Sequence, residues 1–180
     1  GAHGRNRDNR AARREHRVIH TEGAKVTANQ IWLKRVIVEM GGKDSIIVDE
    51  ETNLDEAVAG VTVSAFGFQG QKCSACSRAI VDAKIYDKFV DLLKKRVESI
   101  TIGPPKDLSN YMGPVINQRS MENVLRYIEI GQQEGGRLVA GGMRTPEGGY
   151  FVRPTVIVDV DPKGTIAQQE IFGPVLAVIK

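Results

Sequence analysis

The chain has 180 residues, of which 41% are apolar and 26% charged, proportions typical of a folded globular domain. No apolar run approaches the ~20 residues that a membrane-spanning helix needs. Two cysteines are too few for a secreted disulfide framework. These counts argue against a membrane protein and a disulfide scaffold, so we expect a cytoplasmic protein with no membrane partner.

The start of the chain is strongly basic. Residues 1–17 carry six arginines and two carboxylates, whereas the remaining residues have a slightly negative net charge. This stretch has almost no apolar side chain to bury and no aromatic ring to stack on a base. We therefore interpret residues 1–20 as a disordered or non-native segment, and we expect no nucleic-acid partner.

Short apolar runs and amphipathic stretches alternate in the first half of the chain. Val36–Val38 predicts a strand that turns sharply at two glycines, and Ser45–Val48 predicts a second strand. Asn53 or Asp55 is suited to cap a helix whose apolar stripe at helical spacing ends near Gly67–Gly70. Arg78–Val81 predicts the next strand.

The second half continues the same alternation. Apolar residues at helical spacing predict helices over residues 86–97 and 117–134. Leu138–Val139 and Val156–Val158 predict strands separated by a loop rich in glycine, and Val175–Ile179 predicts a last apolar strand. Strands that alternate with helices indicate a layered α/β fold with an open, mostly parallel sheet and flanking helices. Because the last strand runs to the end of the chain, we expect a piece of a larger protein, with its domain incomplete at both ends.

Cys73 is the candidate nucleophile. It follows a glycine-rich turn at the end of a predicted helix, and a cysteine attacks as its thiolate. We expect N–H groups at the helix end and the ammonium group of Lys72 to stabilise that thiolate. A carboxylate near the cysteine could take a proton from an attacking water, and Glu39, beside two glycines that permit close backbone approach, is the candidate base.

Cys73 and Cys76 also form a Cys-x-x-Cys pair, which serves thiol exchange or metal binding in other proteins. A structural zinc site needs two further cysteine or histidine ligands. The histidines are His3, His16 and His20, all near the start of the chain, so we expect no metal site. A thiol-redox function of the two cysteines remains an alternative at this point.

Three islands of sequence, residues 38–43, 68–75 and 169–175, resemble the NAD(P)-dependent aldehyde dehydrogenase family in order and spacing. The resemblance implies that Cys73 attacks an aldehyde, forming first a thiohemiacetal and then a thioester, and that Glu39 assists hydrolysis of the thioester. It further implies that NAD is the cofactor, that Glu170 hydrogen-bonds the nicotinamide ribose and that Phe172 packs against the nicotinamide.

The same resemblance divides the chain. Residues 21–43 correspond to the end of the cofactor-domain segment, and residues 44–180 to the catalytic domain, truncated at its C-terminal end. In this family the glycine-rich cofactor turn and an oxyanion-hole asparagine lie upstream of Glu39, so we expect the fragment alone to be inactive. A non-catalytic fragment or binding module is the other alternative. Cys76 departs from the family, which commonly has a small residue at this position.

Within the family, residues 33–44, 64–75 and 111–116 resemble the 1-pyrroline-5-carboxylate dehydrogenase branch. This resemblance implies that the small-molecule substrate is L-glutamate γ-semialdehyde, which is oxidised to glutamate in proline catabolism. It also implies that Ser74 contacts the substrate carboxylate, for which its hydroxyl is a suitable donor, and that the full-length enzyme is a homo-oligomer.

Overall fold

The computed structural model describes residues 17–32, 34–37, 40–146 and 148–180. The chain divides into two compact units, Gly1–Met40 and Gly41–Lys180. No helix among the described residues has both the length and the apolar character needed to cross a membrane.

In the first unit, residues 17–24 form a helix that overlaps the end of the basic N-terminal segment. The strand predicted at Val36–Val38 is not found in its described part, because Val36 and Ile37 belong to no strand. A strand exists only through hydrogen bonds to a neighbour, and no strand among the described residues pairs with these two. Ile37 is 88% exposed. Val38 lies outside the described residues.

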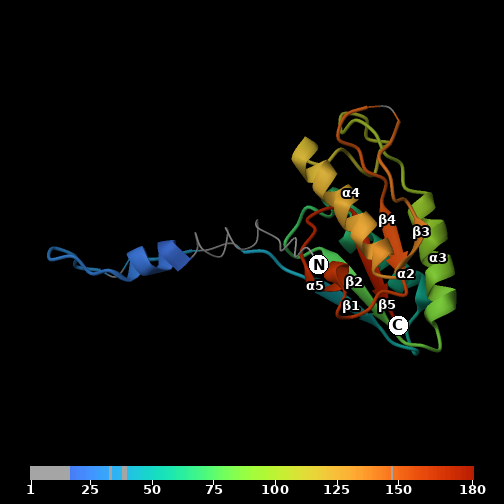
Figure 1. Ribbon diagram of the computed structural model, residues 1–180, viewed down its shortest axis with the longest axis horizontal. Coiled ribbons are helices and arrows are strands. Elements are labelled where there is room, and N and C mark those ends of the chain that lie inside the picture. The colour runs from blue at the N-terminus through green and yellow to red at the C-terminus, as the bar shows by residue number, and fades with distance from the viewer. Residues whose placement is uncertain (1–16, 33, 38–39, 147) are drawn as a thin grey trace. The chain divides into compact units, whose positions relative to one another are not determined.

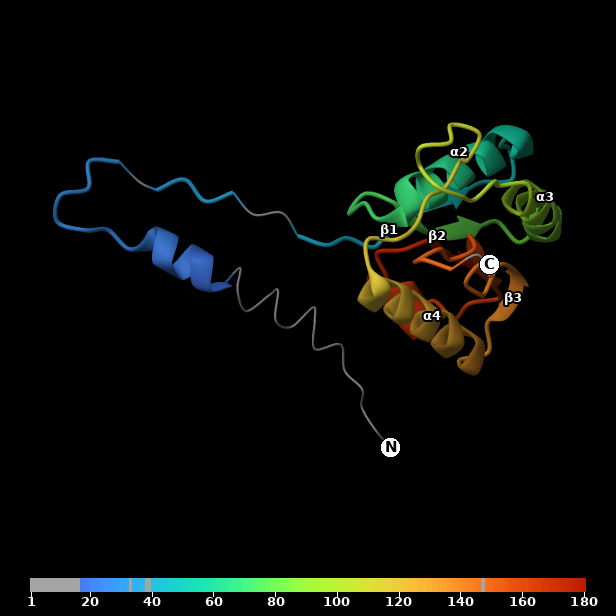
Figure 2. The ribbon, with the colours of Figure 1, turned by 90° about the horizontal axis from the view of Figure 1, so that it is seen from above.

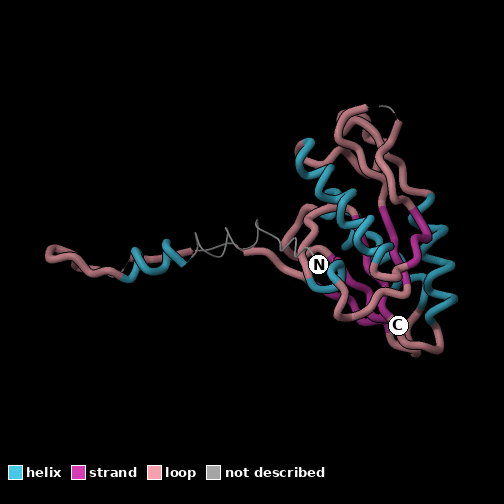
Figure 3. The backbone as a smooth tube through the Cα atoms, viewed as in Figure 1, coloured by secondary structure: helices cyan, strands magenta, loops and turns pink. Residues whose placement is uncertain are grey.

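The second unit is built on a five-stranded sheet with the strand order β1-β2-β5-β4-β3 (Figures 1 and 3). Strands β1 (Asp44–Val48), β2 (Cys76–Val81), β5 (Val175–Ile179) and β4 (Thr155–Val158) are parallel to one another. Strand β3 (Arg137–Ala140) pairs antiparallel with β4 at one edge. The predicted mostly parallel α/β sheet is therefore confirmed.

Helices cover both faces of the sheet (Figure 2). Helices α2 (Leu54–Phe66) and α3 (Tyr86–Glu98) contribute to one hydrophobic cluster. Helix α4 (Gln118–Gln133) and the short α5 (Thr165–Gln168) contribute to a second cluster. The sequence did not predict α5, because four residues are too few to show a helical period.

The sequences of the central strands do not alternate between apolar and polar residues, because both faces of these strands are covered. In β5, Leu176 and Val178 belong to the first cluster, whereas Ala177 and Ile179 belong to the second. Successive side chains of a strand point to opposite faces, so a strand covered on both faces must be apolar throughout. Every residue of β4 and β5 is buried accordingly.

The start of α2 follows the predicted capping, and α4 is capped in the same way. The side chain of Asn53 accepts a hydrogen bond from the Asp55 amide at 3.1 Å, and that of Asn117 accepts one from the Ser120 amide at 2.9 Å. Each satisfies an amide that has no partner within the first turn of its helix.

Candidate active site

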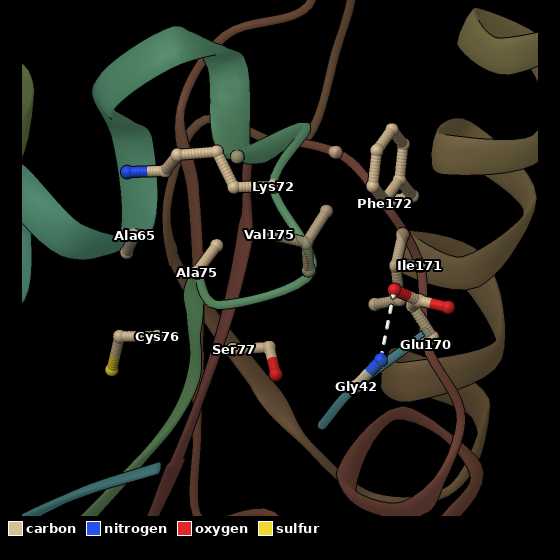
Figure 4. A pocket seen from close by; sticks show the side chains of 12 residues that line it. Gly42, Ala65, Lys72, Ala75, Cys76, Ser77, Glu170, Ile171, Phe172 and Val175 are labelled. Atoms are coloured by element: carbon tan, nitrogen blue, oxygen red, sulfur yellow. Dashed lines mark hydrogen bonds between the residues drawn. The ribbon is translucent and has the colours of Figure 1, made fainter. Parts of the chain in front are cut away.

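Three sequence-distant segments meet at one edge of the sheet. Gly41–Lys43 leads into β1, Lys72–Ala75 leads into β2, and Glu170–Pro174 leads into β5. Because these three strands are adjacent and parallel, the residues that precede them lie at the same edge. The structure therefore brings together the described parts of the three islands on which the sequence-based site rests (Figure 4).

The backbone before Cys73 is unusual. Phe68, Gln69 and Gly70 have φ values of 53°, 57° and 66°, three consecutive residues in the left-handed region. Gly70 also fits sterically where no other residue would, because a Cβ atom there would lie 2.5 Å from the Gly173 carbonyl oxygen and 2.8 Å from that of Ala65. These residues reverse the chain at the end of α2 and send it toward β2.

Cys73 and Ser74 occupy the middle of a tight turn. The Ala75 amide donates a hydrogen bond to the Lys72 carbonyl oxygen at 3.1 Å, which leaves Cys73 and Ser74 at the two central positions. Both residues are exposed. This geometry presents a thiol and a hydroxyl side by side on one turn, open to a reactant.

The expected source of thiolate stabilisation needs correction. The helical stretch that precedes Cys73 in the sequence ends at Gly70. Cys73 therefore follows the carboxyl end of this stretch, where carbonyl groups rather than N–H groups are unpaired. Lys72 turns its side chain back along α2 (Figure 4), and its Nζ atom would lie 3.5 Å from a Cβ atom on Gly67. The expected contribution of helix N–H groups was therefore wrong, because the sequence indicated a helix end but not which polar groups face Cys73, whereas the effect of Lys72 on the thiol stays a prediction.

Gly42 connects the other two segments. Its amide donates a hydrogen bond to Glu170 Oε1 at 3.2 Å, and a Cβ atom on Gly42 would lie 2.5 Å from the Cys73 carbonyl oxygen. A Cβ atom on Gly41 would lie within bonding distance of the Glu170 carboxylate. The paired glycines are therefore required where the carboxylate and the Cys73 turn approach the backbone closely.

Glu170 and Phe172 lie on the segment before β5. The Glu170 side chain is half-buried and held by Gly42, whereas Phe172 is 47% exposed. Phe172 has a φ of 55°, while Ile171 before it is buried in the second cluster. In Figure 4 the Phe172 ring points away from the Glu170 carboxylate. The segment thus offers a fixed carboxylate and an accessible aromatic face.

Cys76 differs from Cys73 in its exposure. Both cysteines are free, but Cys76 is buried and its Sγ atom donates a hydrogen bond to the Arg78 carbonyl oxygen at 3.3 Å. Burial raises the pKa of the Cys76 thiol to about 11. A buried, protonated thiol attacks a disulfide slowly, so this environment gives no support to a thiol-exchange function of the pair.

A second buried group lies beneath the site. No hydrogen-bond partner in the described part of the chain reaches the buried Lys43 Nζ atom. Its burial, followed by the positive charge of Arg78, lowers the pKa of Lys43 to about 8, although the Glu170 carboxylate acts in the opposite direction. The Lys43 carbonyl oxygen accepts a hydrogen bond from Arg78 Nη2 at 2.5 Å. A buried ammonium and the Arg78 guanidinium therefore lie near the Glu170 carboxylate.

A small cavity of about 10 Å³ lies between these segments, with Gly42, Cys76, Ser77 and Glu170 in its lining (Figure 4). A cavity of this size holds about one water molecule. Glu39, the expected base, lies outside the described residues. Within the described ranges, no group of three or more His, Cys, Asp and Glu side chains is arranged to hold a metal ion.

The sequence-based site omitted two glutamines that border Cys73. Gln71 Oε1 accepts a hydrogen bond from the Ile116 amide at 2.9 Å. The Gln69 carboxamide lies against Gly113. Both glutamines lie within the family-like residues 64–75, and residues 111–116 are family-like as well, but neither resemblance indicates that the two segments are in contact.

Known proteins are similar to this chain over most of its length. The family model described as "Aldehyde dehydrogenase family" matches residues 17–180. A 1-pyrroline-5-carboxylate dehydrogenase of Geobacillus sp. (strain WCH70) is 51% identical over 162 residues, which are 90% of this chain and 31% of that protein. One from Bacillus subtilis (strain 168) is 48% identical over the same shares of the two chains.

Solved structures give the same result. The 1-pyrroline-5-carboxylate dehydrogenase from Thermus with bound NAD matches with a TM-score of 0.83 and 48% identity, over 92% of this chain and 32% of that one. The NAD+ complex of aldehyde dehydrogenase from Bacillus cereus matches with a TM-score of 0.78 and 42% identity, over 81% and 30%. The chain therefore spans about a third of the length of these relatives, and it belongs to the aldehyde dehydrogenase family.

Proposed function

We propose that the protein containing this chain is an NAD-dependent aldehyde dehydrogenase that oxidises L-glutamate γ-semialdehyde to glutamate. The observation that carries the proposal is the junction at Gly42, which hydrogen-bonds Glu170 and abuts the Cys73 carbonyl. The names of the Geobacillus and Bacillus relatives support the substrate. The NAD named in the titles of the Thermus and Bacillus cereus structures supports the cofactor.

In the first half of the reaction, the Cys73 thiolate attacks the aldehyde carbon, and a carbon–sulfur bond forms while the carbonyl oxygen becomes an oxyanion. The oxyanion then reforms the carbonyl as hydride leaves the same carbon, so a thioester remains on Cys73. NAD, when bound, supplies the hydride acceptor. The exposed position of Cys73 in its turn supports the role of nucleophile.

In the second half, water attacks the thioester carbon and the carbon–sulfur bond breaks. The carboxylic acid product is released, and the Cys73 thiolate is regenerated. The attacking water must lose a proton, and we assign its acceptance to the carboxylate of Glu39. We expect Glu39→Gln to give a burst of NADH followed by slow turnover, because the amide keeps the shape of the side chain and lacks its basicity.

The residues near β5 fit a nicotinamide nucleotide. The Gly42 amide engages one oxygen of the Glu170 carboxylate and fixes its orientation. A carboxylate held in this way accepts hydrogen bonds from ribose hydroxyls, and the exposed ring of Phe172 offers an apolar face to the nicotinamide. We assign both contacts as proposals for the complete protein.

Ser74 is the proposed contact of the substrate carboxylate. It is exposed beside Cys73 in the same turn, so a substrate bound to Cys73 lies within reach of its hydroxyl. We expect Ser74→Ala to raise the KM for glutamate semialdehyde and to leave simple short aldehydes little affected. We further propose that the enzyme is a cytoplasmic homo-oligomer.

The decisive experiment measures NADH formation from glutamate semialdehyde by the complete protein. Cys73→Ala should abolish the activity, and the control Cys76→Ala, which alters the buried cysteine of the pair, should retain most of it. The 180-residue chain alone should show negligible activity. A Cys73→Ala enzyme with normal turnover would refute the assigned nucleophile, and an inactive wild-type protein with this substrate would refute the proposed reaction.

A further inference from the structure

The backbone at Phe68–Gly70, which leads into the Cys73 turn, has an unfavourable conformation that other contacts must stabilise. Phe68 and Gln69 adopt left-handed conformations that side chains with a Cβ atom disfavour. Such conformations persist only where surrounding contacts stabilise them. The contacts of this stretch therefore determine where Cys73 is placed.

Two carboxamides supply such contacts, one on each side of Gly70. Gln71 Oε1 accepts a hydrogen bond from the Ile116 amide at 2.9 Å. The Gln69 carboxamide lies between the Phe68 carbonyl and the Gly113 amide. Assigned by its hydrogen bonding, its nitrogen donates to the Phe68 oxygen at 3.0 Å and its oxygen accepts from the Gly113 amide at 2.5 Å. Both glutamines thus contact the segment Gly113–Ile116, which we call the brace.

The brace is itself fixed at both ends. Met112, just before it, is buried in the first hydrophobic cluster, and its amide donates a hydrogen bond to the Thr101 carbonyl oxygen at 3.0 Å. Val115, within it, is buried in the second cluster, and its amide donates to the Tyr150 carbonyl oxygen at 2.9 Å. The brace therefore connects the clusters on the two faces of the sheet, and the glutamines transmit that rigidity to the turn.

We propose that Gln71, assisted by Gln69, is a positioning residue that holds the Cys73 turn against the brace and so places the Cys73 thiol relative to Glu170 and Phe172. The role of this placement in catalysis rests on the proposed dehydrogenase function, whereas the hydrogen bond between Gln71 and Ile116 does not. Gln71 acts through its oxygen as an acceptor. A glutamate at this position keeps an acceptor, a leucine keeps bulk without one, and an asparagine has its oxygen one methylene short.

The contact is tested in the 180-residue chain by hydrogen exchange at the Ile116 amide, which requires neither cofactor nor turnover. Gln71→Leu should exchange this amide roughly three- to tenfold faster, as expected for the loss of one neutral hydrogen bond. Gln71→Glu should restore protection. The matched control is Gln133→Leu, because Gln133 is exposed on α4 and its side-chain amide donates a hydrogen bond to Glu129 Oε1 at 3.0 Å, far from the brace in the sequence. This control should leave Ile116 unchanged.

If Gln71→Leu does not fold, as judged by its circular dichroism, Gln71→Asn replaces it with the same expected exchange. Unchanged Ile116 exchange in the folded variant, or an equal change in Gln133→Leu, would overturn the contact. In the complete enzyme, Gln71→Leu should lower kcat roughly tenfold with little change in KM, and Gln71→Glu should recover part of kcat. An unaltered kcat would overturn the positioning role.

An inactive wild-type enzyme combined with the expected exchange would refute the proposed function while leaving the contact standing.

Discussion

The amide of Gly42 donates a hydrogen bond to the carboxylate of Glu170 at 3.2 Å, although the two residues are 128 positions apart in the sequence. The same glycine faces the carbonyl of Cys73 so closely that it has no room for a Cβ atom. One residue without a side chain therefore contacts both other segments of the candidate site. The backbone of Gly42 makes both contacts, so the close approach of the three segments requires that this position has no side chain.

This relationship gives the first prediction. Gly42→Ala places a Cβ atom 2.5 Å from the Cys73 carbonyl oxygen, a backbone atom that can move only with its turn. We expect the free energy of unfolding to fall by about 1–3 kcal/mol, as for other overpacked sites. Urea denaturation of the chain measures it.

Gly60→Ala is the control for Gly42→Ala. A Cβ atom on Gly60 would meet no atom within 4 Å, and Gly60 lies exposed in α2. Alanine should raise the stability there by about 0.5–1 kcal/mol, because glycine is a poor helix former. If both alanine variants had the stability of the wild-type chain, close packing at Gly42 would be contradicted.

The second prediction concerns the two thiols. Cys73 is exposed in its turn, whereas Cys76 is buried and burial raises its pKa to about 11. We expect iodoacetamide at pH 8 to alkylate Cys73 at least about tenfold faster than Cys76, because only an accessible thiolate reacts. Peptide mass spectrometry over a time course measures both rates in one sample. Unfolding in urea is the control, and it should make the two rates similar. Faster labelling of Cys76 in the folded chain would contradict the assignment of Cys73 as nucleophile.

The third prediction concerns the left-handed backbone before Cys73. Phe68 has a φ of 53° with 70% of its surface exposed, so it loses little burial on replacement. Asparagine tolerates this conformation better than phenylalanine. Phe68→Asn should therefore stabilise the chain by roughly 0.5–1 kcal/mol, seen as a rise in the melting temperature.

Leu108→Asn is the matched control for Phe68→Asn. Leu108 is also apolar and exposed, and its backbone is outside the left-handed region. We expect no gain in melting temperature from this replacement. An equal gain in both variants would mean that removal of exposed apolar surface, rather than relief of the backbone conformation, explains the effect.

Most of the sheet could be predicted because its signals are local. The run Val175–Ile179 is apolar throughout, and a strand covered on both faces has no other option. The strand predicted at Val36–Val38 has the same β-branched character, yet its described residues form no strand. A strand needs a neighbour, which β-branched residues alone do not provide.

The site was predicted less completely because contacts between segments are not local. Cys73 and Glu170 could be proposed from their motifs, but their meeting depends on β1, β2 and β5 being adjacent and parallel. The Gln71 contact with Ile116 has no signal in either segment, since a glutamine in a turn is usually solvated. The direction of the Lys72 side chain likewise follows from packing and not from its place in the motif.

The last prediction concerns the pH dependence of stability through Lys43. Burial, with Arg78 nearby, lowers its pKa from the ordinary value of 10.5 to about 8, so the folded chain holds this proton less tightly than the unfolded chain. A group with a lowered folded pKa contributes stability that is present above its unfolded pKa and lost as the pH falls through its folded pKa. Between pH 7 and pH 9, the contribution of Lys43 to the free energy of unfolding should therefore rise by about 1 kcal/mol.

Lys43→Met removes the charge while keeping an unbranched side chain of similar length, so it should abolish this rise. It should also make the chain more stable than wild type at pH 7, by at most about 3 kcal/mol, because no buried ammonium remains to be desolvated. Urea denaturation of both chains at pH 7, 8 and 9 measures the difference. The raised folded pKa of the Cys76 thiol lowers the stability as the pH approaches and passes its ordinary value of 9.0, but both chains contain Cys76, so the comparison isolates Lys43. If the two chains kept a constant difference in stability across this range, the Lys43 ammonium would not be buried in the way that the structure places it.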